Sequence, residues 1–141
     1  MSSILVTLRE IGSCSIKHQE SGAVITSDTP PEYGGQGRSF SATDLLAAAL
    51  GTCIATSIDA LVVRHGIPLD AIKIEVEKEL AVEPKRVARL TVSIQVAMEI
   101  TREVSLRIQR AAEICVVKRS LHPNVAVEVN VVQVCSPTKG E

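Results

Sequence analysis

The chain has 141 residues, enough for one domain with a sizeable core, and we expect a single domain over residues 1–141. Its 15 Lys and Arg side chains nearly balance 16 Asp and Glu, which leaves a net charge of −1. This balance argues against a nucleic-acid or membrane-surface partner, since both would favour a basic protein. With one Tyr and one Phe, the core must consist of Val, Ile, Leu and Ala.

Cysteine and histidine usage points to a reducing compartment and a protein without a metal. No charged segment followed by an apolar run opens the chain, so we expect no signal peptide and a cytoplasmic location. There, four cysteines are reduced or catalytic rather than structural disulfides. The three histidines share no metal-ligand spacing with them, so we expect neither a metal site nor another cofactor.

Three short strands are predicted near the N-terminus, over Ile4–Leu8, Ser13–His18 and Ala23–Thr26. Turn residues separate them, including Gly12 and Gly22. Cys14 falls in the second strand, and no partner thiol is visible for it. We expect it to pack as a small apolar residue.

A loop over Asp28–Ser39 follows, with two prolines and three glycines. Loops of this length are often functional. Arg38 is its one cation, and the only aromatic residues of the chain, Tyr33 and Phe40, flank it. They suggest an apolar rim around a charged group. An equally good alternative is that their side chains only pack the loop against the rest of the protein.

The stretch Phe40–Gly66 predicts a helix that is apolar on every side. No charged residue occurs from position 45 to 58, and such a helix is expected to be buried all round. Ser41 and Asp44 form a capping pair at its start, and Gly66 ends it. It is too short and too rich in Thr, Ser and Gly for a membrane span, so we expect no membrane partner.

Cys53 sits in the middle of this helix. Ala49 and Ser57 flank it on the same face, which leaves room beside the thiol, although simple packing is an alternative. By the helical rise, Cys53 lies about 15 Å from the helix start, too far for much help from the dipole. A cation must therefore stabilise a thiolate there, and Arg38 is the candidate.

The second half of the chain predicts a hairpin, a helix and a last strand. Ile72–Leu80 and Val87–Met98 alternate apolar and polar residues, as antiparallel strands do. A helix over Thr101–Leu121 follows, with Cys115 on its apolar stripe and close to its C-terminal end, where a thiolate is disfavoured. Val125–Val134 is the last strand, with Cys135 at its frayed end. The order predicts an α+β fold with antiparallel sheet.

The motif from Ser41 to Cys53, SATDLLAAALGTC, preceded by a glycine-containing loop and followed by a late Cys115-Val116, resembles the OsmC/Ohr family over essentially the whole chain. The resemblance implies an OsmC-like fold, in which sheets wrap around two central helices of an intertwined homodimer. Active sites would lie at the subunit interface. Where the best-known members carry a Glu, this chain has Thr43, and the acid is Asp44.

The resemblance also implies thiol-dependent reduction of organic hydroperoxides. Cys53 would be the peroxidatic thiol and Cys115 the resolving thiol, and an external dithiol would reset the pair. We expect Arg38 and Asp44 to support Cys53, and Tyr33 and Phe40 to line the substrate entrance.

Two other functions compete with this one. A non-catalytic dimer could hold a small apolar ligand, with the cysteines as packing residues. An acyl-transfer enzyme using Cys53 lacks a base, because His65 lies about three turns away on the same helix. The coincidence of two inward thiols favours the peroxidase.

Overall fold

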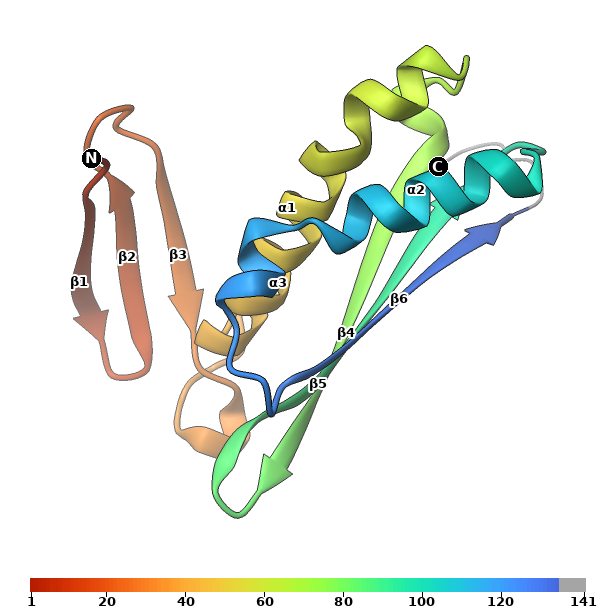
Figure 1. The fold of residues 1–141 in the computed structure, drawn as a ribbon. Coiled ribbons are helices and arrows are strands. Elements are labelled where there is room, and N and C mark those ends of the chain that lie inside the picture. Colours follow the sequence, from red (N-terminus) through yellow and green to blue (C-terminus); the bar gives the residue numbers. More distant parts are fainter. Residues whose placement is uncertain (135–141) are drawn as a thin grey trace. The chain divides into compact units, whose positions relative to one another are not determined.

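The computed structural model describes residues 1–134, and the chain divides into two compact units, Met1–Leu46 and Ala47–Glu141. Cys135 lies outside the described residues. Each unit contains a three-stranded sheet, and the architecture is the predicted α+β class (Figure 1).

The first unit is an antiparallel sheet of β1 (Ile4–Glu10), β2 (Ser13–His18) and β3 (Val24–Asp28), in that order. The register of β1 against β2 shifts between Leu8 and Glu10, which leaves Arg9 at an irregularity of the strand. Such bulges redirect a side chain. A short 3₁₀ turn, η1 (Pro31–Tyr33), lies in the loop that leads to α1 (Ala42–Arg64).

The second unit holds the sheet of β4 (Ile72–Val82), β5 (Lys85–Val96) and β6 (Ala126–Gln133), with η2 (Leu69–Ala71) before β4. Two further helices, α2 (Arg102–Glu113) and α3 (Val116–Ser120), connect β5 to β6. One face of the sheet carries the core, in which the inward residues of β5 are almost fully buried: Leu90, Val92, Ile94 and Val96.

The prediction of a purely antiparallel sheet is wrong for one strand pair. β4 and β5 form the expected antiparallel hairpin, but β6 pairs with β5 in parallel, from Arg89 opposite Ala126 to Val96 opposite Gln133. Parallel neighbours require a long crossover connection, and α2 with α3 supplies it. The predicted order of strands and helices is confirmed, apart from the division of the last helix into α2 and α3. The direction of β6 depends on the end of the sheet to which the connection returns.

The start of α1 is the predicted capping box. The backbone N–H of Ser41 donates to the Asp44 carboxylate at 2.9 Å, and the N–H of Asp44 donates to the Ser41 hydroxyl oxygen at 3.1 Å. Two donors that the helix start would leave unpaired are thereby satisfied. After Arg64, Gly66 adopts a φ of 73°, as the predicted stop requires.

The prediction that α1 is buried on every side is wrong for the single chain. Its buried residues form one stripe, Ala47, Leu50, Ile54, Ile58 and Val62, and the opposite side is exposed. Gly51 marks the close approach to the sheet, because a Cβ there would lie 3.0 Å from a methyl group of Val76. The prediction that this helix is too short for a membrane span is wrong, because α1 has 23 residues with a mean hydropathy of 1.9, long and apolar enough to cross a membrane by length and composition. In this structure its buried stripe contributes to the core of the second unit.

The single helix predicted over Thr101–Leu121 is interrupted. α2 ends at Glu113, and Cys115 has extended backbone angles, φ −66° and ψ 126°, before α3 begins. The apolar stripe continues through Cys115, so periodicity alone gave no sign of the break. The break changes the chemistry at Cys115, which caps the start of a new helix instead of lying near the end of a long one.

Candidate active site

Two thiols predicted to face inward, Cys53 of α1 and Cys115 at the α2–α3 junction, lie close enough in the second unit to shift each other's pKa. Cys115 is fully buried, whereas Cys53 is half-buried. Both are free thiols. Figure 1 shows α3 passing beside α1, which brings residues far apart in sequence to one place.

Several donors converge on the sulfur of Cys53. The thiol of Cys115 and the backbone N–H groups of Val117 and Val116 act on it, and the hydroxyl of Ser57, which donates to the Cys53 carbonyl at 2.7 Å, has the smallest effect. Each donor stabilises the thiolate more than the thiol. The pKa of Cys53 is therefore lowered, first by Cys115 and then by Val117, against the opposing effect of burial.

The pKa of Cys115 moves the other way. Burial is the main cause of the rise, because it disfavours the charged form, and the interaction with the Cys53 thiol adds to it. The N–H of Lys118 donates to the same sulfur at 3.4 Å and partly opposes the shift. The pair is thus arranged as a thiolate at Cys53 and a thiol at Cys115.

The sequence predicts that Cys115 ionises less readily than Cys53 because a helix C-terminus lies nearby, and that reason is wrong. Cys115 is the N-cap of α3, and its side chain accepts the hydrogen bond from Lys118. Its thiolate is disfavoured by burial first and then by the interaction with Cys53, and both raise its pKa. The role of the N–H groups of Val116 and Val117 could not be foreseen, since it depends on the helix break.

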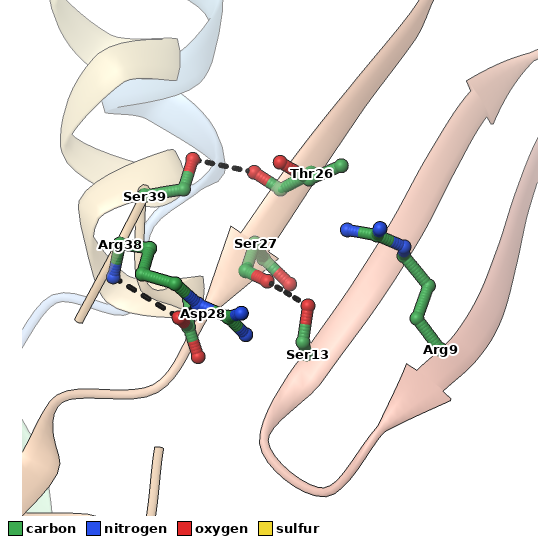
Figure 2. A pocket seen from close by; sticks show the side chains of 7 residues that line it. All are labelled: Arg9, Ser13, Thr26, Ser27, Asp28, Arg38 and Ser39. Atoms are coloured by element: carbon green, nitrogen blue, oxygen red, sulfur yellow. Dashed lines mark hydrogen bonds and ion pairs between the residues drawn. The ribbon is translucent and has the colours of Figure 1, made fainter. Parts of the chain in front are cut away.

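Arg38 belongs to the first unit, where two carboxylates hold it. Its Nε donates to Asp28 at 2.6 Å, and its Nη2 donates to Glu10. Asp28, only 2% exposed, also accepts the backbone N–H of Arg38 at 3.0 Å (Figure 2). The backbone N–H of Gln36 donates to the other carboxylate oxygen at 3.2 Å. The guanidinium of Arg38 is the main cause of an Asp28 pKa lowered to about 2, and the same pair raises the pKa of Arg38.

The acids beside Arg38 are not the one that the sequence suggested. Asp44 accepts a hydrogen bond in the capping box of α1, whereas Asp28 and Glu10 bind the guanidinium. Asp28 opens the loop whose far end carries Arg38, and that placement is the only sequence signal that could have found it. The catalytic role of Asp44 stays a prediction.

The two aromatic residues predicted at a substrate entrance are solvent-exposed, Tyr33 by 56% in η1 and Phe40 by 50%. Phe40 is held by an isolated bridge to Ser27. Both lie in the first unit, together with Arg38, while the thiols lie in the second. Over residues 1–134, no group of three or more His, Cys, Asp and Glu side chains could hold a metal ion.

Comparison with known proteins decides the family. The family model described as "OsmC-like protein" matches residues 35–130. This chain belongs to the OsmC-like family. The matched range runs from the glycine-containing loop through both thiols and into the last strand.

Solved structures of OsmC-like proteins agree with this assignment. A Psychrobacter arcticus 273-4 protein, assigned to the osmotic stress induced and detoxification response, is 30% identical, with 94% of this chain and 96% of that chain covered and a TM-score of 0.87. An organic hydroperoxide resistance protein OsmC from Legionella pneumophila is 18% identical, with coverages of 93% and 96% and a TM-score of 0.72.

The organic hydroperoxide resistance protein OhrB of Bacillus subtilis is 17% identical, with coverages of 94% and 98% and a TM-score of 0.62. At these lower identities the likeness shows the fold alone. Among curated proteins, no sequence matches this chain significantly.

Proposed function

We propose that this OsmC-like protein is a cytoplasmic thiol peroxidase that reduces organic hydroperoxides with Cys53 as the peroxidatic and Cys115 as the resolving thiol. The observation that carries the proposal is the proximity of the Cys115 thiol to Cys53, whose pKa it lowers. Structural relatives described as organic hydroperoxide resistance proteins support the substrate class.

In the first step the Cys53 thiolate attacks the terminal oxygen of the hydroperoxide. The S–O bond forms as the O–O bond breaks, and the alkoxide leaves as the alcohol once it takes up a proton. Cys53 becomes a sulfenic acid, oxidised by two electrons. Donors around the sulfur raise the thiolate fraction, which determines how fast this attack proceeds.

In the second step Cys115 attacks the sulfenic sulfur of Cys53. A disulfide forms, and the sulfenic oxygen leaves as water with the proton of the Cys115 thiol. An external dithiol then reduces the disulfide by thiol–disulfide exchange and is itself oxidised. Cys115 suits the resolving role because it is buried and touches Cys53, so a peroxide meets Cys53 first.

Arg38 and Asp44 would support the chemistry, and Tyr33 and Phe40 would receive the apolar part of the substrate. Arg38 is a permanent cation, and its carboxylate partners fix its direction, which suits it to stabilising a thiolate or a leaving alkoxide. Exposed aromatic side chains can bury an alkyl tail, worth about 0.8 kcal/mol per methylene. Hydrogen peroxide has no such tail.

The protein would act as an intertwined homodimer. Apolar side chains of β1 are exposed in the single chain, with Val6 at 58% and Leu8 at 78%. One side of the apolar helix α1 is also uncovered. A second copy would bury both kinds of surface, and obligate interfaces are apolar in this way.

Peroxide consumed per subunit, measured without dithiol, tests the proposal. The parent protein should consume one equivalent of cumene hydroperoxide and form the Cys53–Cys115 disulfide. Cys115→Ser should also consume one equivalent but stop at the sulfenic acid, which dimedone traps. Cys53→Ser should consume none. With dithiothreitol added, the parent should turn over at its full rate, and neither Cys53→Ser nor Cys115→Ser should reach that rate.

Cys14→Ser is the matched control, because Cys14 lies in β2 and not at the thiol pair. It should behave as the parent in every arm. Consumption by Cys53→Ser but not by Cys115→Ser would reverse the two roles. If no variant consumes peroxide, the non-catalytic ligand-binding dimer becomes the better hypothesis.

A further inference from the structure

A small polar pocket of about 130 Å³ lies within the first unit, away from any role assigned above except that of Arg38. Its lining has one carboxylate, two guanidiniums and four hydroxyls, from Arg9, Ser13, Thr26, Ser27, Asp28, Arg38 and Ser39. Figure 2 shows Arg9 and Arg38 extending toward the pocket from opposite sides, with the hydroxyls of β2 and β3 between them. The volume exceeds the ~30 Å³ share of one liquid water several-fold, which admits a small organic group.

The hydrogen-bonding capacity left in the pocket is mainly donor capacity. Asp28 is already occupied, because its two oxygens accept three N–H groups. The hydroxyl groups of Ser13 and Ser39 donate to the backbone carbonyls of Ser27 and Thr26, at 2.9 Å and 2.8 Å. The guanidinium of Arg9 has no protein partner in residues 1–134, so all its N–H donors remain for a ligand.

The charges around the pocket further restrict the class of ligand that it can bind. Arg38 is matched by Asp28 and Glu10, whereas Arg9 is an unmatched cation placed at the bulge of β1. The two guanidiniums and one carboxylate of the lining carry a net charge of +1, and Glu10, outside the lining, offsets part of it, which favours a monoanion over a dianion. A carboxylate also fits the planar fork of a guanidinium, which can donate two parallel hydrogen bonds.

We propose that this pocket binds the carboxylate group of a small organic acid. Arg9 would be the main hydrogen-bond donor to the carboxylate, and the hydroxyls of Thr26 and Ser27 would be further donors. The proposal uses neither thiol, and of the residues assigned to the peroxidase chemistry only Arg38 lines the pocket. It assigns a function to the bulge in β1, which turns Arg9 out of the regular strand pairing.

Titration of the full-length ¹⁵N-labelled protein with sodium acetate tests the site, with chloride keeping the ionic strength constant. Backbone amide signals at the pocket, followed at Ser13, Thr26, Ser27 and Ser39, should shift and saturate. Arg9→Gln should weaken the affinity about tenfold or more, since hydrogen bonds to a charged group are lost. Arg9→Lys keeps the positive charge but loses the planar guanidinium, so its acetate affinity should lie between those of the parent and Arg9→Gln.

Arg102→Gln is the matched control, because Arg102 is an exposed arginine of α2 in the other unit, and acetate affinity should be unchanged. Three results would overturn the proposal: shifts that do not saturate, equal affinity in Arg9→Gln and the parent, or tighter binding of inorganic phosphate than of acetate at the same ionic strength. If Arg9→Gln fails to fold, Arg9→Lys decides, and parent-like acetate affinity in it would overturn the bidentate role of Arg9.

Discussion

The sulfur of Cys115 serves two neighbours, since it interacts with the thiol of Cys53 and accepts the backbone N–H of Lys118 at 3.4 Å. One buried atom therefore both lowers the pKa of Cys53 and caps α3. The resolving thiol proposed here is part of the machinery that activates the attacking thiol. Removing it should affect the first chemical step as well as the second.

The first prediction concerns the pKa of Cys53. Cys115→Ala removes the donor, so the pKa of Cys53 should rise, and its alkylation by iodoacetamide should need a higher pH. Cys115→Ser keeps an O–H donor and should stay closer to the parent. Rates of Cys53 alkylation between pH 5 and 10, followed by mass spectrometry, give the pKa of Cys53 in the parent and in both variants. A Cys53 pKa in Cys115→Ala equal to that of the parent would show that the thiol contact has no electrostatic role.

The second prediction concerns acid stability. The pKa of Asp28 is about 2 in the folded protein, below the ~3.9 of an unfolded chain, so its ion pair stabilises the fold above about pH 4. This contribution is lost as the pH falls toward 2, because the unfolded state binds the proton first. Asp28→Asn should lower the melting temperature at pH 7, and its difference from the parent should shrink on acidification.

Thermal melts of parent and variant at steps from pH 7 to pH 2 provide the measurement. Asp70→Asn, at an exposed carboxylate in η2, is the control and should show a difference that hardly changes with pH. A constant deficit for Asp28→Asn over the same range would refute the electrostatic origin of its stabilisation.

The third prediction concerns assembly. The exposed apolar residues of β1 and the uncovered side of α1 should make this protein a stable dimer at micromolar concentration. Light scattering coupled to size-exclusion chromatography measures the mass directly, against 15.0 kDa for one chain. Leu8→Glu should weaken the dimer, and Glu20→Gln, at an exposed polar site, should leave it intact. A monomeric parent protein would contradict the proposed interface.

The fourth prediction concerns substrate preference. If Tyr33 and Phe40 receive the alkyl tail, the parent should have a higher kcat/KM for cumene hydroperoxide than for hydrogen peroxide. The double variant Tyr33→Ala with Phe40→Ala should lose most of that ratio, about fourfold for each methylene no longer buried. Leu69→Ala, which removes an exposed apolar side chain of η2, should keep the ratio. A ratio unaffected by the double variant would remove both aromatics from the site.

The sequence determined those features that depend on neighbours along the chain. Ser41 and Asp44 lie three residues apart, so their reciprocal cap could be read directly, and the alternation in 72–80 and 87–98 showed the hairpin. The apolar character of α1 identified the element that carries Cys53. In each case the interaction is local, and its pattern repeats with the period of the helix or strand.

Only the tertiary structure decided what surrounds the reacting groups. Three features depend on where the crossover returns to the sheet. They are the helix break at Cys115, the position of the Val116 and Val117 N–H groups near Cys53, and the parallel pairing of β6. The pairing of Arg38 with Asp28 depends likewise on how a loop closes. Hydrogen bonds between residues distant in sequence have no period along the chain, because packing and burial select them after the backbone has folded.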